Sequence, residues 1–319
     1  MRSLVAASIA AVLAMSAAHA ADKVRLIIST TQAFEMWAPE EALSQGYFKD
    51  EGLDVSIIYG DGGTSSLQAV ATGGADIIIG NGSQSVMSAF SKGAPVKIIS
   101  NSRRGVGELI YYVRPDSPIK TIQDLNGKQL AFSRPGSTTF LVGNFIIKER
   151  KLDTKLVSVG GMPASRTQVM SGQIDTGWAA APSMLDEARK GNIRIFITGN
   201  DVPGLADYSI RVNAANADWL AKNRDVAVRF QRAHWKGMLN LFNSEAAVKR
   251  YADRWGIDFA DAKQMAGKYT LLKDVTFAPI GRVDDLIKLS IEYDMMKETL
   301  TDQQKKDLID IVYDPGPVK

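Results

Sequence analysis

The sequence predicts an α/β protein built from two similar lobes. Its 319 residues repeat at a distance of 99 positions: residues 47–76 align without a gap on residues 146–175, with eight identities in thirty pairs. Short apolar, β-branched runs alternate with helix-like segments in both copies, which favours a parallel sheet covered by helices on both faces. Because two copies are too few for a solenoid, we expect two lobes that hold something between them.

The first copy begins with an apolar, β-branched run at 24–29, which is typical of a buried strand. Its helices are bounded by Gly52 and by hydroxyl caps, Thr64 or Ser65 for one helix and Ser83 or Ser85 for the next. The predicted order is strand 24–29, helix 40–50, strand 53–59, turn 60–63, helix to 72, strand 76–80, helix to 92 and strand 96–100.

The second copy follows the same course. Its predicted order is strand 130–133, helix 138–151, strand 156–159, helix 165–172, strand 175–179, helix 183–190 and strand 193–197. Residues 108–113 and 208–212 read as two strands that cross between the lobes, and the chain from 218 to about 312 is mostly helical, with breaks near Gly256 and 279–281. We expect lobe one to comprise 21–107 plus 206–319, and lobe two to comprise 108–205.

Residues 1–20 are expected to be a signal peptide rather than part of the fold. Arg2 gives a basic start, residues 4–15 form an apolar run, and residues 18–20 form a small-residue cleavage box. The apolar run is too short to span a bilayer. Since the chain contains no cysteine, it has no lipid attachment site and no disulfides. We expect a monomer that is free in the periplasm of a double-membraned bacterium.

Composition argues against several classes of function. The formal net charge of +3, without basic blocks, gives no support to nucleic-acid binding. His19 leaves with the predicted signal, so His234 is the single histidine of the mature chain, and a metal site is not expected. Nucleophile-elbow and phosphate-loop motifs are absent. We therefore predict no catalytic residues and no cofactor.

Several segments resemble a known family in the correct order. Residues 46–55 (GYFKDEGLDV) resemble the "GFF…GLDV" signature of periplasmic binding proteins of the nitrate/sulfonate/taurine class, whose superfamily includes pyrimidine-precursor binders of thiamine synthesis. Residues 116–128 are similar to its "SPIKTPADLKGKKV" linker, and 134–138 to its "GST" loop. Residues 171–175, followed by Trp178 and Pro182, resemble its "SGQIDA…WEP" segment.

This resemblance implies a type II periplasmic binding protein fold that serves an ABC importer, with an inner-membrane permease as partner. Related pyrimidine-precursor synthases of fungi use a Cys-rich motif. The absence of cysteine from this chain counts against that chemistry.

Four glycine- and hydroxyl-rich loops form the expected ligand site. In open α/β sheets ligands bind beyond the carboxyl ends of the strands, and loops 62–65, 80–84, 135–139 and 178–182 follow predicted strands. Free N–H groups at helix starts favour an anionic group; the alternative is that these hydroxyls serve only as N-caps. The resemblance adds the stretch 30–37. The expected ligand-binding residues are Thr31, Gln32, Phe34, Trp37, Gly63, Thr64, Ser65, Asn81, Ser83, Gln84, Arg104, Glu108, Ser133, Gly136, Ser137, Thr138, Thr139, Trp178 and Pro182.

Some of these residues have an equally ordinary structural reading. Arg103 or Arg104 could neutralise a carboxylate or sulfonate, or could be a solvated hinge pair, and Arg134 has the same two readings. Glu108 would suit an amino or amidine group. Either Phe34 or Trp37 could stack on a planar ligand or pack beneath a helix.

The repeat itself marks further positions. Asp76 and Asp175 are expected to be structural in both copies, at the turn between helix and strand. The copies differ where 63–64 (Gly-Thr) aligns with 162–163 (Met-Pro), and where Ile79 aligns with Trp178. We expect ligand specificity to reside at these unmatched pairs.

Our hypothesis from the sequence is a non-catalytic periplasmic receptor that closes two lobes on a small organic anion, either a sulfonate or a carboxylate. A pyrimidine-like thiamine precursor is the alternative ligand. The rivals from other classes are an exported enzyme on the same fold and an extracytoplasmic sensor module.

Overall fold

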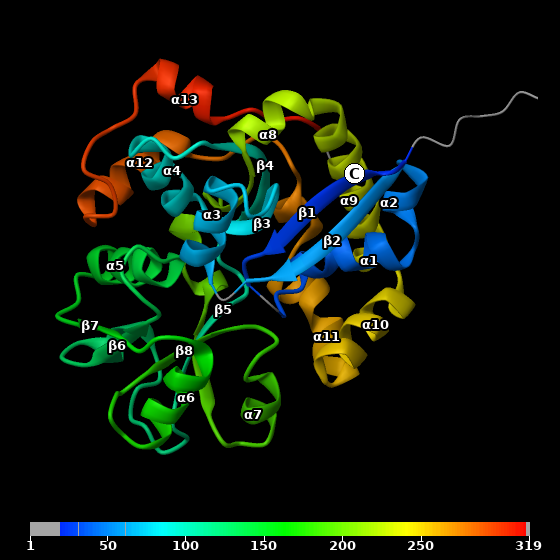
Figure 1. Ribbon diagram of the computed structural model, residues 1–319. Helices are drawn as coiled ribbons and strands as arrows, with labels where there is room; N and C mark the ends of the chain where they lie inside the picture. The colour runs from blue at the N-terminus through cyan, green and yellow to red at the C-terminus, as the bar shows by residue number, and fades with distance from the viewer. Residues whose placement is uncertain (1–19, 31, 61, 317–319) are drawn as a thin grey trace, which may run out of the picture.

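The two-lobed α/β architecture predicted from the sequence is confirmed by the computed structural model, which describes residues 20–30, 32–60 and 62–316 (Figure 1). One lobe is built on a five-stranded sheet and the other on two smaller sheets. The chain passes from one lobe to the other at residues 105–108 and returns at residues 199–208. The lobe boundaries expected from the sequence, at 107/108 and 205/206, stay a prediction. The predicted signal peptide lies outside the described residues, except for Ala20.

Lobe one contains a mixed sheet in the order β2-β1-β3-β10-β4. Strand β1 (Asp22–Ile28) runs parallel to β2 (Leu53–Tyr59) and to β3 (Ile77–Gly82). Strand β10 (Ser209–Asn216) lies antiparallel between β3 and β4 (Val96–Arg104). The sequence predicted a parallel sheet. The antiparallel strand arises because β10 enters this sheet from the other lobe, opposite to the direction of the local strand–helix units.

Lobe two repeats this plan. Strands β6 (Gln129–Phe132) and β7 (Lys155–Ser158) form a parallel pair, while β5 (Leu109–Val113) lies antiparallel between β8 (Gly177–Ala180) and β9 (Arg194–Thr198). The hydroxyl of Thr176 joins the two sheets, since it accepts from the Ala131 N–H at 3.0 Å and donates to the Gln129 carbonyl at 3.1 Å. The resulting order, β7-β6-β8-β5-β9, matches that of lobe one.

The 99-residue repeat corresponds to equivalent structural elements. Helices α3 (Gly63–Ala71) and α6 (Met162–Met170) begin and end 99 positions apart. Asp76 accepts the backbone N–H of Arg25 on β1 at 2.8 Å, and Asp175 accepts that of Gln129 on β6 at 2.9 Å. Both aspartates therefore tie the start of the third strand of their copy to its first strand.

The remaining helices cover the sheets (Figure 1). The predicted helix 40–50 is broken at Gly46, whose φ of 76° lies in the left-handed region, so α1 (Ala38–Ser44) and α2 (Tyr47–Asp50) are separate. Both pack on α9, the longest helix. The others are α4 (Ser83–Ser91), α5 (Thr138–Arg150), α7 (Leu185–Arg189), α8 (Ala217–Lys222), α9 (Arg224–Asn243), α10 (Glu245–Trp255), α11 (Phe259–Gln264), α12 (Val283–Glu292) and α13 (Asp302–Leu308). Within the described residues, no helix is both long and apolar enough to cross a membrane.

Candidate ligand-binding cleft

A cavity of about 440 Å³ lies between the lobes, at the ends of strands from both. Such a position, at a boundary between two structural units, is common for small-molecule sites. Lobe one contributes Ser29, Thr30, Gln32, Gly60, Gly62, Gly63, Thr64, Gly80, Asn81, Gly82, Ser85 and Arg211 to its lining. The first connection and lobe two contribute Val106, Glu108, Leu109, Ser133, Arg134, Ser137, Thr138, Thr139, Gly161, Met162, Pro163, Trp178 and Ala180.

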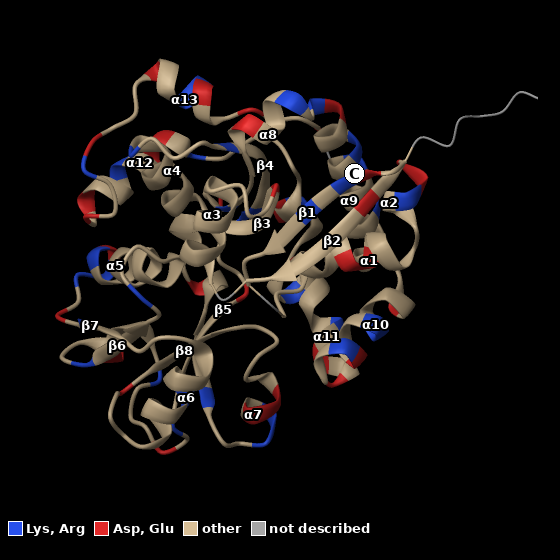
Figure 2. Cartoon of the chain, viewed as in Figure 1, with Lys and Arg blue, Asp and Glu red and all other residues tan. Residues whose placement is uncertain are grey.

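The N-termini of four helices meet at this cavity. Residues at the start of α3, α4, α5 and α6 line it, and each of these helices has at least nine residues. The first N–H groups of a helix lack intrahelical acceptors and carry partial positive charge. None of the four helices has an acidic residue in its first turn, and in Figure 2 α3 and α4 carry the colour of uncharged residues. The positive field at these helix ends is therefore directed at the cavity without internal compensation.

An unpaired amide lies at the wall of the cavity. Asn81 is fully buried, and neither its side-chain oxygen nor its nitrogen has a hydrogen-bond partner within the described part of the chain. A Cβ placed on Gly63 would approach Asn81 Oδ1 to 2.5 Å, so the absence of a side chain at Gly63 makes room for this amide. Because buried polar groups are normally satisfied, this amide is a candidate partner for a ligand in the cavity.

A buried cluster of four charges forms another part of the wall. Arg211 Nη1 lies 2.5 Å from Glu108 Oε1, and Arg103 Nε lies 2.7 Å from Glu108 Oε2. Arg103 also contacts Glu35 at 2.9 Å. Burial acts to raise the pKa of Glu35, but the charges of Arg103 and Arg211 overcome it and hold that pKa below its usual value. The positive charges of the two guanidinium groups and the negative charges of the two carboxylates cancel, so this cluster gives the cavity no net charge.

Arg134 is different, because it brings a positive charge that nothing described nearby balances. It lines the cavity from the loop before α5, and its guanidinium reaches across to lobe one, where a Cβ on Gly62 would lie 3.6 Å from Nη2. Its side chain is exposed, and no carboxylate of the described residues forms an ion pair with it. The charged side chains that line the cavity or belong to the buried cluster therefore sum to one positive charge.

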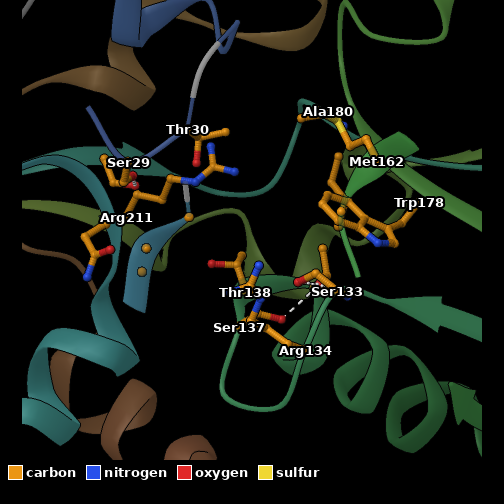
Figure 3. A pocket seen from close by; sticks show the side chains of 18 of the residues that line it. Ser29, Thr30, Ser133, Arg134, Ser137, Thr138, Met162, Trp178, Ala180 and Arg211 are labelled. Carbon is orange, nitrogen blue, oxygen red and sulfur yellow. Dashed lines mark hydrogen bonds between the residues drawn. The ribbon is translucent and has the colours of Figure 1, made fainter. Parts of the chain in front are cut away.

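Trp178 and Met162 form an apolar part of the wall. Figure 3 shows them beside Ala180, apart from Ser29, Thr30 and Arg211. The indole N–H of Trp178 donates to the Gly160 carbonyl at 3.2 Å, and its backbone N–H donates to the Ser165 hydroxyl at 3.0 Å. These two bonds fix the ring.

Ten of the residues predicted for the site line the cavity: Gln32, Gly63, Thr64, Asn81, Glu108, Ser133, Ser137, Thr138, Thr139 and Trp178. Arg134, given the same two readings as Arg104, lines it as well. Thr31 lies outside the described residues.

The two aromatic residues predicted for the site in the stretch 30–37 lie in the protein core. Phe34 is fully buried, and its ring lies 5.3 Å from those of Phe242 and Tyr251 in edge-to-face geometry. Trp37 packs against Tyr251 and Trp255. Because α10 of the helical tail lies beneath this segment, both rings are covered by protein rather than available to a ligand.

The other predicted residues that lie off the cavity make hydrogen bonds within the protein. Arg104 donates to the Pro279 carbonyl at 2.8 Å, and the Ser83 hydroxyl donates to the Ser209 carbonyl. Ser65 donates to the Gly62 carbonyl at 3.1 Å, and Gln84 donates to Thr138 Oγ1 at 3.4 Å. Gly136 and Pro182 are neighbours of the lining segments but are not part of the lining.

Arg211 is the main lining residue that the sequence reasoning missed. It is a charged residue within a short apolar strand, and that pattern is a signal of a buried ion pair. Ser29 and Ser85 were also missed, whereas Thr30 belongs to the stretch 30–37 that was expected at the cleft. Met162 and Pro163 were marked only as an unmatched pair of the repeat, and both line the cavity.

Comparison with known proteins places this arrangement in a family. The family model described as NMT1/THI5-like matches residues 41–247, well over half of the chain. The chain belongs to the NMT1/THI5-like family. A curated relative, the putative binding protein YtlA of Bacillus subtilis, is 25% identical over 209 residues, which cover 64% of this chain and 62% of YtlA. The chain thus spans less than two thirds of that relative.

Solved structures show that this NMT1/THI5-like chain has the fold of periplasmic binding proteins of ABC importers. The periplasmic aliphatic sulphonate binding protein SsuA of Escherichia coli superposes with a TM-score of 0.70 at 16% identity, covering 93% of this chain and 94% of SsuA. A cysteine-to-serine mutant of DszB in complex with biphenyl-2-sulfinic acid superposes with a TM-score of 0.63 at 15% identity, covering 89% of this chain and 96% of DszB. At such identities the likeness concerns the fold.

Proposed function

We propose that this protein is a non-catalytic periplasmic receptor that captures a small organic anion, a sulfonate or a carboxylate, and delivers it to an inner-membrane ABC permease. The observation that carries the proposal is the convergence on one cavity of Arg134 and of four helix N-termini, none of which has an acidic residue in its first turn. Both features attract negative charge, and they act on the same cavity.

The placement of these groups couples binding to closure. Gly63 and Thr64 belong to lobe one, whereas Arg134 and Ser137 belong to lobe two. The lobes already share direct polar contacts beside the cavity. The Ser183 hydroxyl donates to Gln32 Oε1 at 3.1 Å, and the Ser85 hydroxyl donates to the Gly136 carbonyl at 3.3 Å. Arg211 and Glu108 form an ion pair there as well. A ligand that contacts both sides adds contacts that exist only when the lobes are together, and it therefore shifts the population to the closed form.

One observation favours a second candidate ligand. The buried amide of Asn81 offers a donor beside an acceptor, and Trp178 offers a flat surface. A neutral, pyrimidine-like heterocycle could use both. It would leave Arg134 and the four helix ends without a negative partner, so we rank it below an anion.

Catalysis has little support in the cavity. Its lining contains no histidine or cysteine among the described residues, and His234 is buried within the protein. The likeness to DszB, however, means that an exported enzyme on this fold must be tested directly. A sensor module would bind its ligand in the same way, and it would differ in engaging a kinase or chemoreceptor instead of a permease.

The test is a thermal-shift and calorimetric screen of sulfonates, carboxylates, nitrate and pyrimidines. At 100 times its dissociation constant a ligand should raise the free energy of unfolding by about 2.7 kcal/mol. Mass spectrometry of the recovered ligand should show it unchanged. Turnover would establish an enzyme, and binding restricted to neutral heterocycles would establish the second candidate.

The matched variants are Arg134→Ala and Arg150→Ala, which remove exposed arginines before and at the end of α5. Loss of a hydrogen bond to a charged group should weaken anion binding by roughly 10- to 100-fold in the first variant. The second should bind as the parent protein does. Equal affinities in all three proteins would refute the assignment of an anion to this cavity.

A further inference from the structure

The two copies of the repeat present opposite chemistry to the cavity at their equivalent helix starts. Helix α3 begins with Gly63 and Thr64, and helix α6 begins 99 positions later with Met162 and Pro163; all four residues line the cavity. Gly63 has no side chain to cover the free N–H groups of α3. Pro163 has no N–H, and the Met162 side chain occupies the space in front of α6. The start of α6 is therefore a poorer anion site than that of α3.

The third strands of the two copies, β3 and β8, also differ in what they present to the cavity. Ile79 of β3 is buried in the core of lobe one, whereas Trp178, its counterpart in β8, is partly exposed and lines the cavity. Because the indole N–H of Trp178 is bonded to the Gly160 carbonyl, the residue offers a ligand only the apolar surface of its ring. Met162 Sδ accepts the Ala180 N–H at 3.4 Å, so the methionine beside the ring is also held in place.

The polar groups gather elsewhere in the cavity. Figure 3 shows Arg134, Ser137 and Thr138 together on the loop before α5, apart from Trp178 and Met162. The guanidinium of Arg134 lies close to Gly62 at the start of α3. The cavity is thus divided into a charged end at α3 and α5 and an apolar end at β8 and α6.

We propose that the solute is an amphiphilic anion with a single flat ring, whose charged group binds between Arg134 and the N-termini of α3 and α5 while the ring lies against Trp178 and Met162. This inference rests on the proposed receptor function and specifies its substrate class. A cavity of about 440 Å³ is in the lower part of the range of small-molecule sites, which suits one ring rather than several. The unmatched pairs of the repeat are then the residues that select the apolar part of the ligand.

The experiment compares anions that share a head group and differ in the apolar part: methanesulfonate with benzenesulfonate, and acetate with benzoate. Isothermal titration should show each aromatic anion binding at least about tenfold more tightly than its small partner, since a buried ring adds apolar area and stacking. In Trp178→Ala this ratio should fall to less than about threefold. Arg134→Ala should weaken both members of each pair by the same factor and leave the ratio unchanged.

A second variant covers the case in which Trp178→Ala does not fold. Replacing Met162→Gly and Pro163→Thr gives α6 the first residues of α3, and it should also reduce the preference for the aromatic anion. Equal binding of methanesulfonate and benzenesulfonate by the parent protein would overturn the inference and leave the receptor function standing. An unchanged ratio in folded Trp178→Ala and in the Met162→Gly, Pro163→Thr protein would also overturn it. If no anion of either series binds, the proposed capture of an anion fails, and the inference fails with it.

Discussion

Arg211 of β10 and Glu108, the residue before β5, form an ion pair of 2.5 Å that joins the two lobes at the wall of the cavity. The pair is continuous with Arg103 and Glu35, so four charges share one buried site in a balanced set. Such a cluster is tolerated because each charge has opposite neighbours. Removal of a single member leaves an excess charge in a region of low polarity.

We therefore predict that Glu108→Gln lowers the free energy of unfolding by about 3–5 kcal/mol, as expected for a broken buried ion pair. The double variant Glu108→Gln, Arg211→Gln restores the balance, and it should lose less stability than the sum of the two single variants. Urea denaturation of the four proteins measures both effects. Strictly additive losses would show that the two residues do not interact energetically.

Because Gly63 makes room for the Asn81 amide, we expect a side chain at position 63 to affect ligand binding. In Gly63→Ala the new methyl group would lie 2.5 Å from Asn81 Oδ1, so the amide must move. Loss of one hydrogen bond to the ligand should weaken binding about tenfold. Thr72→Ala is the control, because Thr72 is exposed at the opposite end of α3 and does not line the cavity. Titration should show near-parental affinity in the control; a similar loss in both variants would contradict this account.

His234 predicts a dependence of stability on pH. Burial lowers the pKa of His234 to about 3, so the ring stays neutral in the folded protein. In the unfolded chain its pKa is about 6.5. The unfolded state therefore binds an extra proton as the pH falls through 6.5, and between pH 7 and pH 4 folding should lose about 3 kcal/mol through this group.

His234→Gln tests this prediction, since glutamine does not titrate. The carboxylates contribute equally to both proteins, so the difference between the two pH profiles isolates the histidine. Urea denaturation at pH 4 to 7 should give a flatter profile for the variant. Parallel profiles would mean that the pKa of His234 is the same in the folded and unfolded states.

The equivalent aspartates of the repeat predict a shared structural role. Asp76→Ala and Asp175→Ala each leave a strand N–H without its acceptor, which should cost about 1–3 kcal/mol. The loss should be larger at Asp76, which also binds the Arg25 guanidinium. Asp153→Ala, at an exposed position in lobe two, is the control and should change stability by less than about 0.5 kcal/mol. Hydrogen exchange should show faster exchange of the Gln129 N–H in Asp175→Ala alone.

The loops of the cavity could be predicted from the sequence because their signals are local. Gly63, Thr64, Ser137 and Thr138 combine glycine or hydroxyl residues with the start of a helix that follows a strand, and a topological rule then places such starts at one edge of the sheet. The 99-residue repeat then predicted a second lobe with the same arrangement. The two-lobed architecture followed from these two observations.

The rest depends on contacts between distant parts of the chain. Phe34 and Trp37 follow the first strand as a ligand-stacking residue would, and only α10, more than 200 residues later, decides that they are core. The partnership of Glu108 and Arg211 likewise requires knowing that β10 returns to lobe one next to β4. Neither the packing of α10 on these aromatic residues nor the position of β10 in the sheet can be recognised from the residues close by in the sequence.

The position of Trp178 gives the protein an intrinsic optical reporter. The chain has five tryptophans, and Trp178 lines the cavity while Trp37, Trp219, Trp235 and Trp255 pack in or against the core clusters. A ligand that covers this indole changes the polarity around one fluorophore and leaves the others as an internal standard. Emission spectra of the unlabelled protein should therefore follow occupancy in real time, and the rates of capture and release can be measured by stopped flow without attaching a dye.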